Sequence, residues 1–285
     1  MTLPSSMPKG QIGLSTPLDS RSCELRRMVI RCLRGGRRGH LGASLSLIEI
    51  LRVLYDDILR HDPAQPGWQG RDRMILSKGH GCLAQYALLA DHGYFPLEAL
   101  DVFCHHDGIL GGHPDAAKIP GVEASTGALG HGLSIGVGRA LALKRAGSDR
   151  RVFVVLGDGE CNEGAVWEAA LSAGNHGLDN LTLLVDYNKN QSYGPTYEVQ
   201  DLEPLADKWR AFGFAAVEVD GHDVETLRAT LSNVPLEKYK PTAIVCHTVK
   251  GKGVQFAENN LAWHHKSKIN DDDIAAMLEC LGGWQ

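Results

Sequence analysis

The sequence has little that would place the protein in a membrane or on a nucleic acid. Its 285 residues contain no apolar run that approaches the roughly 18–20 residues of a membrane span. The 29 basic and 34 acidic side chains give a net charge of −5, and no long basic run occurs. Such a charge pattern lacks the positive surface of nucleic-acid-binding proteins. We therefore expect a protein that binds neither membranes nor nucleic acids.

Cysteine also lacks the arrangement that disulfides or a zinc site would need. The seven cysteines are scattered, their number is odd, and no Cys-x-x-Cys pair occurs. This pattern indicates buried thiols in a reducing compartment. The segment from Met1 to Pro17 is rich in proline, serine and glycine and has no apolar core of the kind found in signal peptides. We expect a cytoplasmic protein whose residues 1–20 form a flexible tail.

What the sequence does contain is an alternation of apolar runs with helical patterns near residues 162–176, 202–212 and 223–232. Strands that are apolar on both faces and alternate with helices are typical of a parallel sheet with helices on both faces. No linker is found after residue 20, so we expect a single α/β domain over residues 21–285. The expected strands are residues 74–76, 151–156, 181–185, 215–219 and 242–246.

Two helices are expected before the first strand, and two more, one from about residue 80 to 92 and one within residues 127–146, between the first and second strands. An apolar stripe from Leu25 to Leu33 predicts a helix that Gly35 and Gly36 end. Ser44 is expected to cap the second helix. In residues 127–146, glycine, alanine and serine alternate with leucine, isoleucine and valine. This composition predicts a buried helix that packs closely, either in the core or in a subunit interface.

A glycine-rich turn after the strand 151–156 has the features of a phosphate-binding site. The turn is Gly157-Asp158-Gly159, and glycine lets the backbone approach a ligand closely. The next helix would point its N-terminal amides at that ligand. Asp158 would repel a phosphate unless a cation lay between them, and Mg²⁺ shares oxygen ligands with phosphates. Asn188 follows the next strand, so it is expected at the same sheet edge.

Gly-Asp-Gly with an asparagine about thirty residues further on resembles the thiamine diphosphate motif. The resemblance implies a thiamine diphosphate-binding fold that takes the cofactor together with Mg²⁺, for which Ca²⁺ or Mn²⁺ can substitute. It implies that Asp158, the Asn188 side chain and the main-chain oxygen of Asn190 hold the metal. Gly157 and Gly159 would contact the diphosphate.

Four histidines lie in loops, mostly beside glycine. Such loops can converge on one crevice, and imidazole is suited to moving protons between hydroxyl and carbonyl oxygens near neutral pH. The four are therefore candidates for one active site that moves protons between hydroxyl and carbonyl oxygens. They are His40, His80, His113 and His264.

These histidine segments, together with residues 120–130 and 250–254, resemble the N-terminal half of transketolases over nearly the whole chain from about residue 20. The resemblance implies that His40, His113 and His264 face the sugar and that His80 and His264 lie near the diphosphate. It also implies that a short backbone segment contacts the aminopyrimidine end of the cofactor. This segment consists of Gly127, Ala128 and Leu129.

Two positions depart from the family pattern. His131 stands where an uncharged polar residue is usual, and His265 follows His264 where glycine is common. Each is either a neutral surface change or a change in the choice of donor or acceptor sugar.

Transketolases move a two-carbon ketol unit from a ketose phosphate to an aldose through the C2 carbanion of thiamine diphosphate. They need an activating glutamate from a pyrimidine-binding domain that full-length members carry after the segment seen here. Because this chain stops at Gln285, just after its last family motif, it resembles the N-terminal subunit of a split transketolase. We expect activity only with a partner subunit that carries the second domain, in an α2β2 heterotetramer.

Glu163 bears on this expectation of a partner. The resemblance implies that its carboxylate pairs across the subunit interface with the activating glutamate. The alternative is an exposed glutamate that only interacts favourably with the dipole of the following helix.

Two other functions remain open from the sequence. The α subunit of a 2-oxo acid dehydrogenase shares the thiamine motif and the split architecture, but the histidine segments and the Lys-Gly-Lys-Gly run argue against it. A non-catalytic thiamine diphosphate-binding protein is the second alternative. Against it, Asp158, Asn188 and all four histidines are intact.

Overall fold

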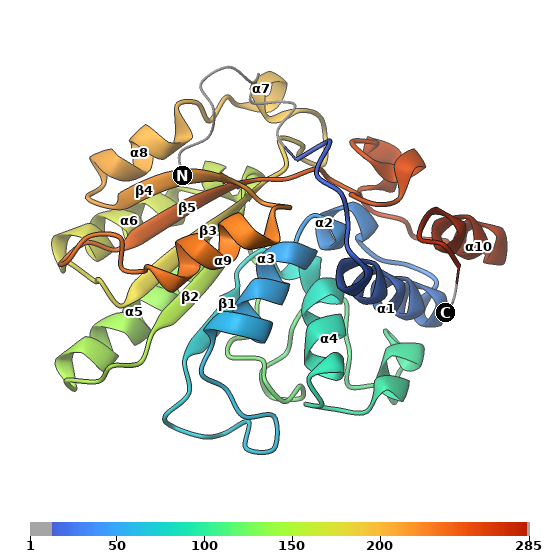
Figure 1. The fold of residues 1–285 in the computed structure, drawn as a ribbon, viewed down its shortest axis with the longest axis horizontal. Coiled ribbons are helices and arrows are strands. Elements are labelled where there is room, and N and C mark those ends of the chain that lie inside the picture. Colours follow the sequence, from blue (N-terminus) through green and yellow to red (C-terminus); the bar gives the residue numbers. More distant parts are fainter. Residues whose placement is uncertain (1–12, 284–285) are drawn as a thin grey trace.

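The chain folds around one parallel β-sheet (Figure 1). The computed structural model describes residues 13–283. All neighbouring strands run parallel, in the order β1-β2-β3-β5-β4, which confirms the predicted α/β fold. The strands are β1 (Arg73–Leu76), β2 (Val152–Gly157), β3 (Leu181–Tyr187), β4 (Ala215–Asp220) and β5 (Thr242–His247).

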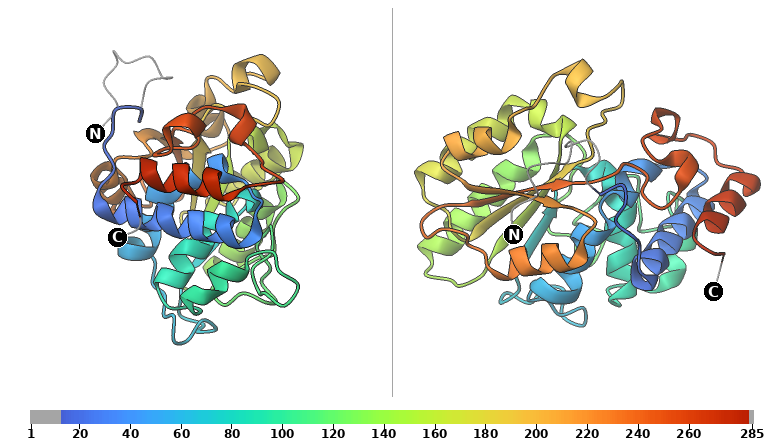
Figure 2. Two further views of the ribbon diagram at one scale, coloured as in Figure 1. Left: turned by 90° about the vertical axis from the view of Figure 1, so that its right-hand side faces the viewer. Right: turned by 45° about the horizontal axis from the view of Figure 1, so that its top comes forward.

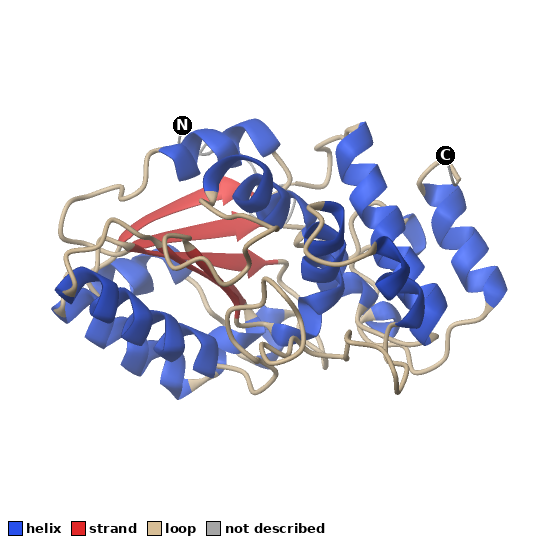
Figure 3. Cartoon of the chain, turned by 90° about the horizontal axis from the view of Figure 1, so that it is seen from below, coloured by secondary structure: helices blue, strands red, loops and turns tan. Residues whose placement is uncertain are grey.

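Side chains of the central strands alternate between two apolar layers. Along β2, Val152, Val154 and Leu156 belong to one layer, whereas Phe153 and Val155 belong to the other. Every residue of β2, β3 and β5 is buried, because helices cover both faces of the sheet (Figure 3). This two-sided burial is why most positions of these strands are apolar, instead of only alternate ones.

The helices divide between these layers. The layer that contains Val154 includes α5 (His131–Arg145), α6 (Gly164–Asn175) and α8 (Leu205–Ala211). The layer that contains Phe153 includes α1 (Ser20–Gly36), α2 (Leu41–Leu45), α3 (Ile48–Val53), α4 (Cys82–Asp91), α9 (Val224–Ser232) and α10 (Asp271–Cys280). The short α7 (Thr196–Val199) lies in the connection between β3 and α8.

The end of α1 differs from the prediction. The helix runs through Gly35 and Gly36, and the left-handed residue that ends it is Arg37, with a φ of 54°. A Cβ atom at Gly35 would lie 2.3 Å from the carbonyl oxygen of Asp101. Glycine is therefore needed at this position because two segments approach closely. From the sequence alone, a glycine of this kind cannot be distinguished from one that ends a helix.

Ser44 does not cap a helix, as the sequence had suggested. It lies inside α2, and its hydroxyl donates to the carbonyl oxygen of His40 over 2.9 Å. The next helix, α3, begins after Leu47 without a side-chain cap. A serine inside a helix can also bond back to a carbonyl one turn earlier, so residue type alone did not decide its role.

The helix predicted over residues 127–146 begins at His131 and is only half buried in this chain. Gly132 and Gly136 face the sheet, where a Cβ atom would lie 2.3 Å from Ser77 and 2.4 Å from Val154. Gly138 and Ile135 face outward, and Ile135 is 37% exposed. Small residues all round the helix hid which face packs, so the prediction of a buried helix was wrong for the chain alone.

The C-terminal helix α10 lies beside α1 (Figure 2). Its first turn is a capping box in which Asn270 and Asp273 exchange hydrogen bonds between side chain and backbone. Arg27 of α1 donates to the carbonyl oxygen of Leu281 just after α10. None of the helices in residues 13–283 is long and apolar enough to cross a membrane.

The flexible tail predicted over residues 1–20 lies mostly outside the described residues. In the part that is described, the Lys252 ammonium donates to the carbonyl oxygens of Gly13 and Leu14, both over 2.8 Å. The Thr16 hydroxyl donates to Asp220 over 2.5 Å. These contacts hold residues 13–16 near the loop after β5.

Candidate functional site

Parallel pairing brings the Gly-Asp-Gly turn and Asn188 to one edge of the sheet. Gly157 at the end of β2 pairs with Asp186 in β3, and the two strands end side by side. Asp158 and Asn188 follow these strand ends directly, at the carboxyl edge where ligands bind in sheets of this kind. The residues that the thiamine motif singled out are therefore neighbours in space.

Asp158 is a buried carboxylate whose hydrogen-bond donors within residues 13–283 are backbone amides. It is 3% exposed, and its two oxygens accept from the amides of Gly159 over 2.6 Å and Lys189 over 2.5 Å. Burial, with the nearby carboxylate of Asp186, raises the pKa of Asp158 to about 6. Because its surroundings disfavour the charged form of this carboxylate, a cation bound beside Asp158 would stabilise that form.

The amide of Asn188 is fixed by two hydrogen bonds. Its Nδ2 donates to Asp186 over 3.3 Å, and its Oδ1 accepts from the amide of Asn190 over 3.2 Å. The main-chain oxygen of Asn190 accepts from the ammonium of Lys250 over 2.8 Å. One carboxylate, one amide oxygen and one carbonyl oxygen are thus held at the same edge, an all-oxygen set of the kind that Mg²⁺ prefers.

This set differs from a site made of histidine, cysteine and acidic ligands. Among residues 13–283, no three or more such side chains are placed to hold a metal ion together. The candidate oxygen set contains a single carboxylate, so it does not belong to that kind of site.

Three charged residues at this edge had no assigned role in the sequence analysis. Asp186 is fully buried and accepts from Lys78 and from Ser46. Burial alone would raise the pKa of Asp186, but the ammonium of Lys78 lowers it overall. Burial lowers the pKa of Lys250 to about 8, although Asp158 acts against this. Lys78 lies in the segment that carries His80, and Lys250 lies in the segment 250–254. Both segments were part of the sequence analysis, so their lysines could have been recognised as candidate site residues.

The four histidines predicted to share a crevice do lie together. The ring of His40 is 5.4 Å from that of His80, 6.3 Å from that of His113 and 5.8 Å from that of His264, measured between centroids. The rings of His80 and His264 are 6.1 Å apart. They come from the segment after α1, the turn after β1, a long loop before α5 and the segment before α10.

Burial keeps these imidazoles neutral. With His265 and His113 adding to the effect, it lowers the pKa of His40 to about 4. Burial, followed by the charge of Lys250, lowers the pKa of His264 to about 3. The pKa values of His80 and His113 are also lowered by burial. A neutral imidazole has one donor and one acceptor nitrogen, which allows hydrogen bonds to both hydroxyl and carbonyl oxygens.

His264 has one nitrogen without a partner. Its Nε2 lies 3.0 Å from the hydroxyl of Ser192, whereas its buried Nδ1 has no hydrogen-bond partner among the described residues. Buried polar atoms are nearly always satisfied, so an unpaired one inside a cluster of this kind points to a ligand. Gln191, beside Gly159, also has a buried and unpaired Nε2.

The two residues that depart from the family pattern lie in different places. The ring of His265 is 4.6 Å from that of His40 and therefore belongs to the cluster. His131 is the exposed first residue of α5. The structure thus separates two substitutions that looked alike in the sequence.

The segment Gly127–Leu129 lies against the cluster. Gly127 has a φ of 157°, and a Cβ atom there would lie 3.3 Å from the ring of His113. The segment is anchored by Glu160, whose Oε1 accepts from the amide of Gly130 over 2.8 Å and whose Oε2 accepts from the amide of Gly157 over 3.1 Å. Glu160, which the sequence analysis missed, thereby joins this segment to the Gly-Asp-Gly turn.

Glu163 stands at the N-terminus of α6 and is exposed. Its side chain makes no cap hydrogen bond. It has no ion-pair partner among residues 13–283, and it lies close to Gly130. Its carboxylate thus has no partner within the described part of the chain and lies near the site.

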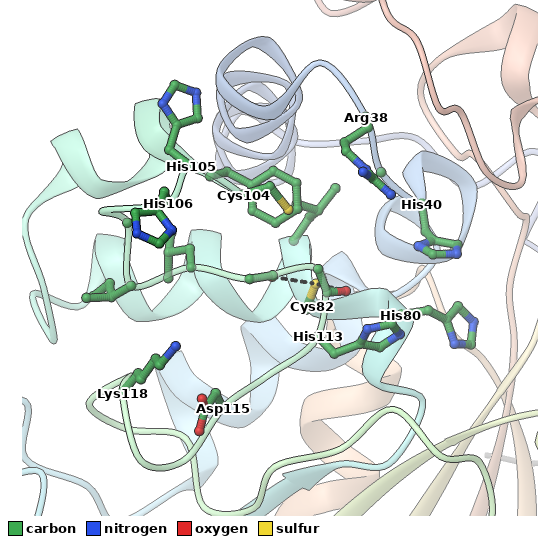
Figure 4. A pocket seen from close by; sticks show the side chains of 18 of the residues that line it. Arg38, His40, His80, Cys82, Cys104, His105, His106, His113, Asp115 and Lys118 are labelled. Atoms are coloured by element: carbon green, nitrogen blue, oxygen red, sulfur yellow. Dashed lines mark hydrogen bonds between the residues drawn. The ribbon is translucent and has the colours of Figure 1, made fainter.

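A cavity of about 580 Å³ opens beside the histidines (Figure 4). His40, His80 and His113 line one part of it, and His265 lies there as well. A cavity of this size is large enough for a small metabolite.

Comparison with known proteins agrees with this geometry. The family profile "Transketolase, thiamine diphosphate binding domain" matches residues 21–285. The chain is 43% identical to the 6-deoxy-6-sulfo-D-fructose transketolase subunit SqwG of Clostridium sp. (strain MSTE9), over 85% of this chain and 88% of that protein. It is 42% identical to an apulose-4-phosphate transketolase subunit of Actinobacillus succinogenes, over 89% of this chain and 92% of that protein.

Solved structures give the same result. The transketolase of Pichia stipitis in complex with sedoheptulose 7-phosphate superposes with a TM-score of 0.87 at 31% identity. The match covers 92% of this chain and 40% of that chain. The chain belongs to the transketolase family and corresponds to its thiamine diphosphate-binding part. This confirms the family and the fold that the sequence motifs indicated.

Proposed function

We propose that this chain is the thiamine diphosphate-binding subunit of a two-chain transketolase that moves a two-carbon ketol unit from a ketose or ketose phosphate to an aldose. The observation that carries the proposal is the convergence of four neutral histidines on the sheet edge that holds Asp158 and Asn188. The relatives matched over most of their length are named as transketolase subunits, which supports a two-chain enzyme.

The residues at the sheet edge fit a magnesium diphosphate group. Asp158, Asn188 through Oδ1 and Asn190 through its carbonyl oxygen would hold Mg²⁺, or Ca²⁺ or Mn²⁺ in its place. The buried, unpaired Nδ1 of His264 and the ammonium of Lys250 lie where a diphosphate would need donors. When bound, thiamine diphosphate supplies the nucleophilic carbon that carries the two-carbon unit.

The diphosphate needs further contacts from the chain. We assign them to the turn that follows β2, to the imidazole that follows β1 and to the buried lysine beside it. These residues are Gly157, Gly159, His80 and Lys78. The backbone of Gly127, Ala128 and Leu129 would contact the aminopyrimidine end, because Glu160 holds this segment against the same turn.

The histidines handle protons on the sugar in this proposal. His40, His113 and His264 would donate to or accept from the hydroxyl and carbonyl oxygens of the substrate. Their lowered pKa values keep them neutral at pH 7, so each can act in either direction. A positively charged cluster could only donate, and its members would repel one another.

The partner subunit would complete the site. Glu163 is exposed at the edge of the site and is available to pair with a glutamate of the partner's pyrimidine-binding domain. We propose two copies of each chain, because the exposed face of α5 offers a second surface that remains uncovered in one chain.

The decisive experiment is co-expression of this chain with the product of the neighbouring gene. Ketol transfer from a ketose phosphate to an aldose is measured with thiamine diphosphate and Mg²⁺, and each chain alone serves as control. We expect activity only in the mixture and its loss in Asp158→Ala. Activity of this chain alone would contradict the need for a partner. Turnover of pyruvate with a dye acceptor, without ketol transfer, would instead favour a 2-oxo acid dehydrogenase. A stable complex without either activity would favour a non-catalytic role.

A further inference from the structure

The segment after β5 carries two buried lysines separated by one glycine, and the fold directs them at different parts of the chain. The ammonium of Lys250 donates to the carbonyl oxygen of Asn190, at the edge where the metal is proposed to bind. The ammonium of Lys252 donates instead to the carbonyl oxygens of Gly13 and Leu14, both over 2.8 Å. The backbone of this segment therefore decides which of the two lysines faces the cofactor site.

The side chain of Lys250 has little room to compensate for a displaced backbone. A Cβ atom at Gly42 would lie 3.0 Å from the Cγ atom of Lys250. The amide of Gly251 donates to the carbonyl oxygen of Gly42 over 3.1 Å, so the two segments are in direct contact. A Cβ atom at Gly251 would lie 2.4 Å from the carbonyl oxygen of Ala257. Because these contacts leave no slack, a shift of the backbone would move the ammonium of Lys250 away from its partner.

A buried chain of hydrogen bonds begins at the residue before Lys250. The amide of Val249 donates to Nε2 of His222 over 2.9 Å. Since this nitrogen accepts, the proton of the neutral ring lies on Nδ1. Nδ1 in turn donates to the carboxylate of Glu49 over 2.8 Å. The imidazole thus connects the backbone of the lysine segment to a carboxylate of α3.

The same carboxylate is connected to the other side of the segment through Arg26 of α1. The guanidinium donates to both oxygens of Glu49, over 2.6 Å and 3.0 Å, and its Nε donates to the carbonyl oxygen of Lys252 over 2.8 Å. Its two remaining N–H groups donate to the carbonyl oxygens of Ser22 and Leu45. Every donor of Arg26 is therefore used, and the chain of hydrogen bonds closes on the lysine segment at both ends.

We call Arg26, Glu49 and His222 the Glu49 network. Its members are 0%, 1% and 2% exposed, and none of them lines the cavity at the histidines. Burial alone would raise the pKa of Glu49, but the charge of Arg26 and the hydrogen bond from His222 lower it overall, so the carboxylate stays ionised. Apolar residues of similar volume are often as stable as a buried ion pair. Stability by itself thus does not account for these groups, whereas fixing one segment of backbone does.

We propose that Arg26 and His222, joined through Glu49, are positioning residues that hold Lys250 at the edge where the metal and the diphosphate bind. This inference rests on the transketolase function proposed above and adds the device by which the chain places its own cation there. Groups that orient a metal ligand through a second hydrogen bond affect metal affinity nearly as strongly as the ligand does. We expect the same here, because Lys250 bonds to the carbonyl oxygen that is assigned to the metal.

The test measures the affinity of the two-chain complex for thiamine diphosphate at saturating Mg²⁺ by calorimetry. His222→Leu removes the acceptor of the Val249 amide and the donor to Glu49, and we expect it to weaken binding about tenfold. His222→Gln keeps one donor and one acceptor and should bind within about twofold of the wild type. Leu231→Ala, at a buried position near the end of α9, is the control for stability and should lower the Tm without changing the affinity.

A double variant separates positioning from a general loss of stability. If the Glu49 network acts through Lys250, His222→Leu should cause no further loss of affinity in a Lys250→Met background, although it should lower the Tm in both backgrounds. Losses that add in the double variant, or an unchanged affinity in His222→Leu, would overturn the inference. If His222→Leu does not fold, Arg26→Lys takes its place, because it keeps a cation beside Glu49 but lacks the Nε donor to Lys252.

Ketol transfer by the same wild-type complex separates this inference from the proposed function. A complex that binds thiamine diphosphate and shows the coupling between His222 and Lys250, but transfers no ketol unit, would refute the function and leave the positioning role in place. A complex that transfers ketol units while His222→Leu binds the cofactor normally would refute the positioning role alone. A wild-type complex that binds no thiamine diphosphate would overturn both.

Discussion

The ammonium of Lys250 donates a 2.8 Å hydrogen bond to the carbonyl oxygen of Asn190, the main-chain oxygen assigned to the metal. Lys250 reaches this point from the segment after β5, and Asn190 follows β3, the strand beside it. The lysine is buried, with its pKa lowered to about 8. The chain thus places a cation of its own at the edge where the metal and the diphosphate are proposed to bind.

We expect Lys250→Met to weaken the binding of thiamine diphosphate in the presence of Mg²⁺ about tenfold or more, because a charge-assisted hydrogen bond contributes about 1.5–3 kcal/mol. Calorimetric titration of the two-chain complex measures this. Lys238→Met, at an exposed position, is the control. Unchanged affinity in Lys250→Met would show that the ammonium does not contact the cofactor.

Asp158→Asn separates cofactor binding from folding. The buried carboxylate of Asp158 has a raised pKa and forms no ion pair within residues 13–283, so the neutral amide breaks none; its Nδ2 would, however, face one of the two backbone amides, and the change should cost the free chain about 1–3 kcal/mol. A bound ligand at a hundred times its dissociation constant stabilises the folded state by about 2.7 kcal/mol. We therefore expect thiamine diphosphate with Mg²⁺ to raise the Tm of the wild type but not of the variant. A similar rise in both would contradict the assignment of Asp158 as a metal ligand.

The histidine cluster predicts a loss of stability at acid pH. The pKa of His40 is lowered to about 4 in the folded chain, below the ordinary value of about 6.5. As the pH falls below 6.5, the unfolded chain therefore binds more protons than the folded chain, and the free energy of unfolding decreases until about pH 4. His40→Asn should reduce this loss. Tm values at pH 7.5 and 5.0 measure it, with the exposed His176→Asn as control. An identical pH dependence in wild type and His40→Asn would refute the prediction.

A buried ion pair couples α1 to α3. Arg26 donates to both oxygens of Glu49, over 2.6 Å and 3.0 Å, and the imidazole of His222 lies 2.8 Å from the same carboxylate. Breaking such a pair from one side leaves an uncompensated buried charge and costs about 3–5 kcal/mol. We expect this loss for Arg26→Met in chemical unfolding.

Two comparisons test the cause of that loss. The double variant Arg26→Met with Glu49→Met should be more stable than the sum of the single changes predicts, by about 1–3 kcal/mol. Arg31→Met breaks a partly exposed pair on the same helix and should cost about 1 kcal/mol or less. Additive single changes at Arg26 and Glu49 would show that the charges are not coupled.

Glu163→Gln tests the subunit interface. Because the side chain is exposed and has no partner within residues 13–283, the variant should unfold at the same temperature as the wild-type chain when studied alone. In the two-chain complex we expect kcat to fall about a hundredfold, the usual scale for a group that supports proton transfer. Glu168→Gln, an exposed position one turn further along α6, provides a comparison for general charge effects. Full activity of Glu163→Gln would show that the Glu163 side chain has no role in catalysis beyond its interaction with the dipole of α6.

Much of the site was predictable because its residues lie at motif positions with fixed local geometry. Gly-Asp-Gly followed by Asn188 requires only that two adjacent strands run parallel, which their apolar character already indicated. The four histidines were predictable as candidates because each lies in a loop, mostly beside glycine. Their distances from one another were not, since four separate loops have to be placed before any pair can be measured.

Lys78, Asp186 and Glu160 show what the sequence could not supply. Asp186 directly follows the expected strand 181–185, and its role follows only from the ammonium and hydroxyl groups that surround it. Glu160 sits between two motif residues, but its partners are backbone amides of Gly130 and Gly157 in different segments. Hydrogen bonds between segments far apart in the chain leave no periodic pattern behind.

The sequence by itself determined the parallel α/β fold, the family and the positions of the candidate ligands, because strand burial and turn chemistry are local properties that residue types record. The tertiary structure decided which face of α5 packs and which of the two unusual histidines joins the cluster. These depend on the distances between segments and on the burial that follows from them, and only the packed chain sets both.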